Sequence, residues 1–156
     1  MKYTRLTKEQ FEELHQEFIN FLATQSITAE EWQDIKENKP QVAEQELDVF
    51  SDLVWEGVLS QALFVENLSK HHIYMFHFTE AIIELIGLKL SNESIDLTTS
   101  EGFGWLRENL LDESVELFTA NKDYSEDRSL DKFALIQQGG HITKGELFRY
   151  FEKLVG

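Results

Sequence analysis

Two groups of histidine and glutamate residues carry side chains that could bind a metal ion. Glu12 and His15 have the spacing with which one helix supplies two ligands to a di-iron site. Such a site needs a second pair of the same kind, and no other histidine follows a glutamate at this spacing. His71 and His77 would share one face of a strand, but they would lie about 20 Å apart at about 3.3 Å per residue. We therefore predict neither a metal site nor a cofactor.

The motifs of the common catalytic and phosphate-binding sites are missing from the sequence. Residues 121–127 resemble the start of a calcium loop, but Glu126 stands where the turn requires glycine and Lys132 where a glutamate should bind. The glycines near residues 102 and 139 continue into neither phosphate-binding pattern, and no G-x-S-x-G motif occurs. The sequence predicts no catalytic residue and favours a protein that is not an enzyme. An active site assembled from dispersed residues stays an open alternative.

The composition is typical of a single folded domain that works inside the cell. The chain has 156 residues, 42% of them hydrophobic, and no cysteine, which excludes disulfides and thiolate metal ligands. The N-terminus lacks the apolar stretch of a signal peptide, and the most apolar segment, residues 73–90, contains charged side chains. We predict one domain over residues 1–156, a cytoplasmic location and no membrane partner.

The net charge of −15 is large and unevenly distributed. Residues 28–56 carry −7 and residues 91–131 carry −8, whereas residues 132–156 carry +2. Such a field repels nucleic acid and favours either solubility or a basic partner. We therefore predict a non-catalytic protein-interaction or regulatory domain whose acidic surface meets a basic protein.

Helical patterns dominate the N-terminal part of the chain. Apolar residues recur at helical spacing over residues 7–25, 28–37 and 41–61, and Pro40 separates the second helix from the third. Three helix starts share a capping pattern, in which threonine is followed three residues later by glutamine or glutamate: Thr7, Thr28 and Thr143. Each cap should stabilise its helix by about 1 kcal/mol.

The middle of the chain has the composition of β-strands. Residues 62–66, 71–79 and 81–90 are rich in Phe, Ile, Tyr and Leu, and residues 115–120 alternate in polarity. We predict an α+β fold with N-terminal helices, an antiparallel meander of three or four strands, and C-terminal helices. If residues 73–90 were helical, the fold would be all-α. An exposed edge strand of such a sheet would allow two copies to form a homodimer.

Three residues are candidates for contacts with a partner. Trp55 would point toward the polar side of its helix, where an aromatic side chain can anchor an interface. Arg149 and Lys153 lie in the only basic part of the chain, residues 130–154, where two helices would flank a Gly139-Gly140 turn. This segment supports an alternative function, a nucleic-acid-associated regulator with a helix-turn-helix-like element. The charge of −17 on residues 1–131 disfavours that alternative.

Four segments resemble a known family of short acidic bacterial proteins, a domain of unknown function. They are residues 2–7, 27–32, 50–56 and 139–147, so that the resemblance spans most of the chain. It implies a bacterial, intracellular protein. It implies no activity, cofactor or catalytic residue.

Overall fold

The computed structural model describes residues 1–155, which fall into two compact units with separate hydrophobic cores. One unit, residues 1–60, is helical, and the other, which begins at residue 61, contains all the strands. The described residues form seven helices and a five-stranded antiparallel sheet, which confirms the predicted α+β fold and excludes the all-α alternative. The predicted single domain over residues 1–156 stays a prediction. None of the described helices has the length and apolar character that a membrane-spanning helix requires.

Aromatic rings fill the core of the helical unit. Its helices are α1 (Lys8–Glu13), α2 (His15–Thr24), α3 (Ala29–Asn38) and α4 (Pro40–Gln61). Phe18 packs edge-on against Phe50 at 5.1 Å and against Trp32 at 5.2 Å. Thr7 forms the predicted capping box and Thr28 caps α3 by accepting a hydrogen bond from a backbone N–H. The single helix predicted over residues 7–25 is broken at residue 14, although neither glycine nor proline marks the break.

The N-terminal segment lies against a row of carboxylates on α4. Asp52 accepts hydrogen bonds from the backbone N–H groups of Lys2 (2.8 Å) and Tyr3 (2.9 Å). Asp48 forms an ion pair with the Arg5 guanidinium at 2.7 Å. The row repeats about once per helical turn and consists of Glu44, Asp48, Asp52 and Glu56. Part of the strong negative charge of this unit is therefore paired within the unit itself.

The sheet runs in the order β4-β3-β2-β1-β5, and each strand is antiparallel to its neighbours. Its strands are β1 (Phe64–Leu68), β2 (His72–Phe78), β3 (Ile82–Leu90), β4 (Val115–Asp123) and β5 (His141–Thr143). The first four agree with the predicted strands to within a few residues. The long strands β4 and β3 pair along their whole length, from Ile82 opposite Asp123 to Leu90 opposite Val115.

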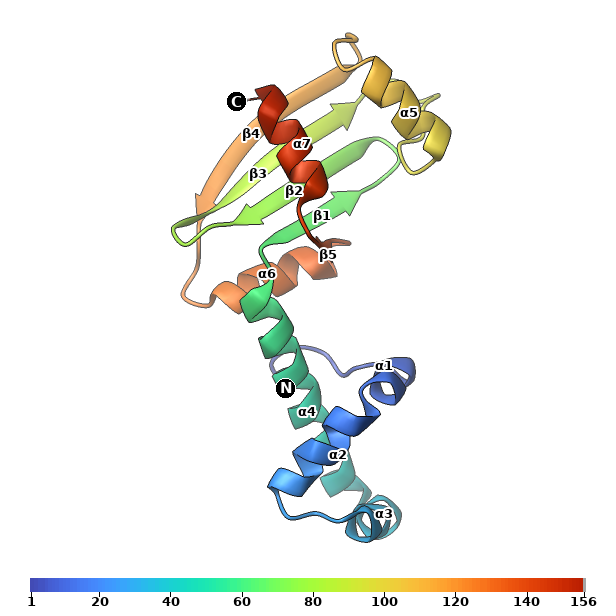
Figure 1. Cartoon of the computed structure of the whole chain (residues 1–156), viewed down its shortest axis with the longest axis vertical. Coiled ribbons are helices and arrows are strands. Elements are labelled where there is room, and N and C mark those ends of the chain that lie inside the picture. Colours follow the sequence, from blue (N-terminus) through green and yellow to red (C-terminus); the bar gives the residue numbers. More distant parts are fainter. Residues whose placement is uncertain (156) are drawn as a thin grey trace. The chain divides into compact units, whose positions relative to one another are not determined.

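Helices cover both faces of the sheet. The helix α7 (Glu146–Val155) lies across one face (Figure 1) and buries Phe148 and Phe151 against strand residues such as Met75. The helix α5 (Ser100–Glu108) adds Leu106 to the same core. On the other face, α6 (Arg128–Gln137) packs Leu135 into a smaller cluster with β-strand residues. This layering explains why β2 is apolar on both of its faces.

The structure corrects the predicted turn between the last two helices. Residues 141–143 form β5, which pairs with β1, so α6 and α7 do not adjoin across a simple turn. Thr143 therefore lies in a strand and does not cap α7, which begins at Glu146. Gly139 has a φ of +108° directly after α6, as expected for the residue that ends a helix. A three-residue strand is too short to be recognised from its composition.

Candidate functional site

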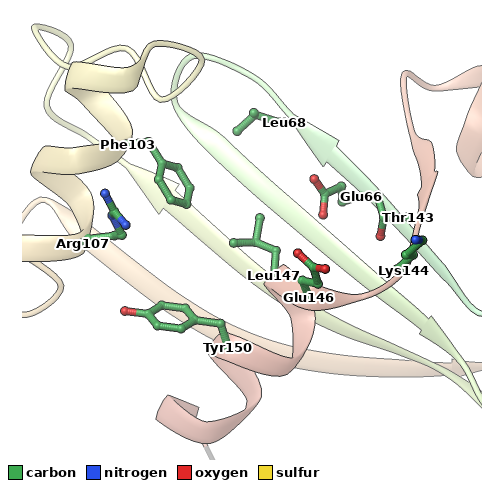
Figure 2. A pocket seen from close by; sticks show the side chains of 9 residues that line it. All are labelled: Glu66, Leu68, Phe103, Arg107, Thr143, Lys144, Glu146, Leu147 and Tyr150. Carbon is green, nitrogen blue, oxygen red and sulfur yellow. The ribbon is translucent and has the colours of Figure 1, made fainter.

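A cavity of about 620 Å³ opens in the sheet unit between β1, β5, α5 and α7. Figure 2 shows Phe103 and Arg107 on one side, Glu66, Thr143 and Lys144 on the other, and Leu147 between them. Its size is within the range of ligand-binding pockets. The lining combines an apolar floor with charged side chains and consists of Glu66, Leu68, Phe103, Arg107, Thr143, Lys144, Glu146, Leu147 and Tyr150.

Glu66 is the most unusual side chain of the cavity. It lies in the middle of β1, where its neighbours in the sheet are Met75 on β2 and His141 on β5. Burial raises the pKa of this carboxyl above the usual value, and the nearby His141 partly opposes the shift. Within residues 1–155, no hydrogen bond or ion pair joins the Glu66 carboxylate to another group. A partly buried carboxylate without a partner is costly to keep ionised, so a cation from a ligand would stabilise it.

Two cationic side chains stand at the edge of the cavity. The Arg107 guanidinium lies 5.9 Å from the centre of the Phe103 ring, in a cation–π contact between two residues of α5. Lys144 is exposed and follows β5 directly. Neither side chain forms an ion pair with a described residue. Both can therefore donate hydrogen bonds to carbonyl or carboxylate oxygens of a bound molecule.

Local backbone features fix the elements that line the cavity. Thr99 accepts a hydrogen bond from the backbone N–H of Gly102 and so starts α5. Gly145, with a φ of +83°, turns the chain from β5 into α7 beneath the ring of Phe64. A Cβ atom at Gly145 would lie 2.5 Å from that ring, so only glycine fits there without a shift.

The polar groups of the cavity do not form a catalytic arrangement. The hydroxyls of Thr143 and Tyr150 have no hydrogen-bonded base among the described residues, so neither is activated as a nucleophile. No group of three or more His, Cys, Asp or Glu side chains in residues 1–155 could hold a metal ion. The cavity has the features of a binding site, an apolar floor with a few convergent charges.

The structure places the predicted interface residue Trp55 against the hydrophobic core of the helical unit. It is partly buried on α4, and its ring centre lies 6.5 Å from that of Tyr3 in the N-terminal segment. It also packs against the cluster that contains Phe18 and Phe50. Trp55 therefore contributes to packing within its unit and does not line the cavity.

Arg149 and Lys153 lie on the exposed side of α7. The Arg149 guanidinium forms an ion pair with Glu152 at 2.9 Å and sits 5.3 Å from the centre of the Phe64 ring. It is thus already engaged within the sheet unit. Because β5 also separates α6 from α7, this part of the chain differs from a helix-turn-helix.

The helical unit contains a second hollow, of about 750 Å³. Apolar side chains such as Phe11, Phe18 and Trp32 form its walls, and Lys8 and Lys36 lie at its edge. No buried polar group points into it. The cavity of the sheet unit is therefore the better candidate for specific binding.

Sequence reasoning identified none of the cavity residues. A signal was present for Glu66, since it lies two residues after Phe64 and must share the face of β1 on which Phe64 is buried. An acid at an inward position of a strand marks a possible site. Arg107 and Lys144 had no such signal. Arg107 is exposed on a helix and Lys144 is exposed in a loop, where basic residues are common.

Comparison with known proteins agrees with the resemblance noted in the sequence. Neither a search of curated proteins nor a search of solved structures finds a match for this chain. The model of a protein family, described as "Family of unknown function (DUF6495)", matches residues 1–156, the whole chain. The chain therefore belongs to the family of unknown function DUF6495.

Proposed function

We propose that this protein is a non-catalytic, cytoplasmic interaction domain of bacterial origin that binds a basic segment of a partner protein. The observation that carries the proposal is the Glu66 carboxylate, partly buried in the cavity and without a hydrogen bond or ion pair to the described residues. A lysine or arginine of the partner would pair with it and offset its lost hydration. An apolar side chain next to that cation would cover Phe103 and Leu147.

The charge of the whole protein supports the same class of partner. A net charge of −15 attracts a basic protein over long range and speeds its association. Once the segment is bound, Arg107 and Lys144 can donate hydrogen bonds to its backbone carbonyl oxygens. Long-range attraction would thus bring the partner close, and the cavity would select the segment.

The experiment is affinity capture of the tagged protein from its own cells in low salt, with three forms of the bait. They are the natural chain, Glu66→Gln, and the control Glu113→Gln, which removes an exposed acid outside the cavity. Glu66→Gln preserves the shape of the side chain, so its loss of binding would not reflect misfolding. We expect a stoichiometric protein that the natural chain and the control retain and that Glu66→Gln loses.

Two results would contradict the proposal. A partner captured equally by all three forms would show that the cavity does not bind it. Nucleic acid in the eluate, lost when Arg149→Glu and Lys153→Glu are combined, would instead support the nucleic-acid-associated alternative.

A further inference from the structure

The strand β4 forms one edge of the sheet and is protected by neither a short length, nor a bulge, nor a proline. It is nine residues long, whereas β5 at the other edge has three. Every residue from Val115 to Asp123 pairs with one residue of β3, so the strand has no bulge, and it contains no proline. Natural edge strands are commonly short, bulged or interrupted by proline, because a regular edge can pair with another strand.

The hydrogen bonds of the ladder show which backbone groups of β4 face outward. The N–H of Ser91 donates to the carbonyl of Ser114 at 2.9 Å, in the same register as the rest of β3 and β4. Antiparallel pairs alternate between bonded and non-bonded positions, so the even-numbered residues of β4 bond to β3. Leu117, Thr119 and Asn121 therefore direct their N–H and C=O groups away from the sheet.

The charges on β4 are self-complementary about its central residue. If a twofold axis passes through Thr119, antiparallel pairing with a second copy places Glu116 opposite Lys122 of that copy, and the reverse pair forms on the other side. Both side chains are exposed, and neither forms an ion pair within residues 1–155. An axis at residue 118 would place Glu116 opposite Ala120, and an axis at residue 120 would place it opposite Tyr124. Only the register centred on Thr119 pairs both charges.

The register also satisfies the backbone. Thr119 would form a hydrogen-bonded pair with Thr119 of the second copy. Leu117 of each copy would form a further hydrogen-bonded pair with Asn121 of the other. Residues 116 and 122 would then occupy non-bonded positions, where side chains on facing strands are closest and charge pairs are most effective.

One end of α7 adds apolar surface beside the axis. Val155 lines a hollow together with Thr119 and Asn121, and the residue is 38% exposed. The twofold axis of an antiparallel pair is perpendicular to the sheet, so the α7 helices of both copies would lie on the same face. The dimer would therefore cover part of this exposed apolar end.

We propose that two copies of this chain join through β4, in the antiparallel register centred on Thr119, to form one continuous sheet with five strands from each copy. This interface is independent of the proposed partner site, because the cavity lies at β1 and β5 and β4 is the opposite edge of the sheet. Both cavities would remain open in the dimer.

The test is sedimentation velocity of the full chain over a hundredfold range of concentration. A salt concentration of about 0.15 M reduces the range of charge effects to about 8 Å, which limits the repulsion between two acidic copies. We expect the 18.2 kDa monomer to convert to a species of twice that mass as the concentration rises. A monomer at every concentration would overturn the proposal.

Charge variants test the register. Lys122→Glu should weaken dimerisation at least tenfold, and so should Glu116→Lys, because each places like charges opposite one another. The combined variant keeps the net charge of −15 and should restore the dimer. An equimolar mixture of the two single variants should form a heterodimer with opposite charges at both positions.

The opposing explanation, control by net charge alone, makes a different prediction. Glu116→Lys reduces the magnitude of the net charge from −15 to −13. If only the repulsion between the two copies mattered, this variant would dimerise more strongly than the natural chain. That result would overturn the proposal. So would an unchanged dimer of Thr119→Pro, since proline removes the outward N–H at the centre of the interface and is tolerated at sheet edges.

Discussion

Gly145→Ala should destabilise the sheet unit severely, although it adds only one methyl group. Gly145 has a φ of +83°, a conformation that costs an alanine about 1–2 kcal/mol. The new Cβ would also lie 2.5 Å from the Phe64 ring. That ring is packed between other rings, parallel to His77 at 4.5 Å and near Phe148 at 5.7 Å, so it cannot move aside freely. Overpacking of this kind costs about 1–3 kcal/mol.

The two effects together give a loss of about 2–5 kcal/mol in the free energy of unfolding. Urea denaturation followed by circular dichroism measures it. The matched control is Gly104→Ala, the same chemical change within α5, where a Cβ would meet nothing within 4 Å. The control should gain about 0.5–1 kcal/mol, because alanine favours a helix more than glycine does.

The opposite signs make the comparison decisive. Surface substitutions usually change the free energy of unfolding by no more than about 0.5 kcal/mol. If the free energy of unfolding of Gly145→Ala differs from that of the natural chain by no more than this, the turn beneath Phe64 is not as described. Gly145 would then not fix the start of α7, nor the positions of Lys144 and Leu147 in the cavity.

Three further predictions test other parts of the structure. Glu66→Gln should raise the melting temperature at neutral pH. Because the pKa of Glu66 is raised in the folded state, the natural chain loses stability as the pH rises above the usual glutamate value, and the difference between the two proteins should shrink toward pH 4. Asp52→Ala should cost about 1–3 kcal/mol in urea denaturation, since Asp52 accepts two backbone hydrogen bonds, whereas Asp48→Ala, which breaks an ion pair close to solvent, should cost less than about 1 kcal/mol. Lys132→Met should cost about 1–3 kcal/mol by the same assay, because the buried Lys132 ammonium donates to the carbonyl of Ala62 at 2.7 Å.

The fold was predictable from the sequence where the signal is local. Runs of Phe, Ile, Tyr and Leu marked the strands β1 to β3, and threonine caps marked two of the three helix starts. The same capping pattern was misleading at Thr143, because pairing of that residue with Phe64 across the sheet takes precedence over local end chemistry. Propensity reasoning cannot detect such a contact between distant residues.

The candidate site was not predictable in the same way. Glu66, Phe103 and Leu147 come from three separate elements, and only the fold brings them to one cavity. No spacing pattern in the sequence predicts that these three residues lie close together. Arg149 and Lys153 were predicted to contact a partner because they are basic residues in an acidic chain. Composition does not show that Arg149 forms an ion pair with Glu152.

The distribution of unpaired groups also decides which acidic surface can serve a partner. In the helical unit, the row of carboxylates on α4 already binds the N-terminal segment through Lys2, Tyr3 and Arg5. A partner would have to displace those contacts. In the sheet unit, the Glu66 carboxylate and the outward backbone groups of β4 have no hydrogen-bond partner within the described residues. Since unsatisfied groups gain the most from a new contact, binding activity is expected in the sheet unit, even though both units are strongly acidic.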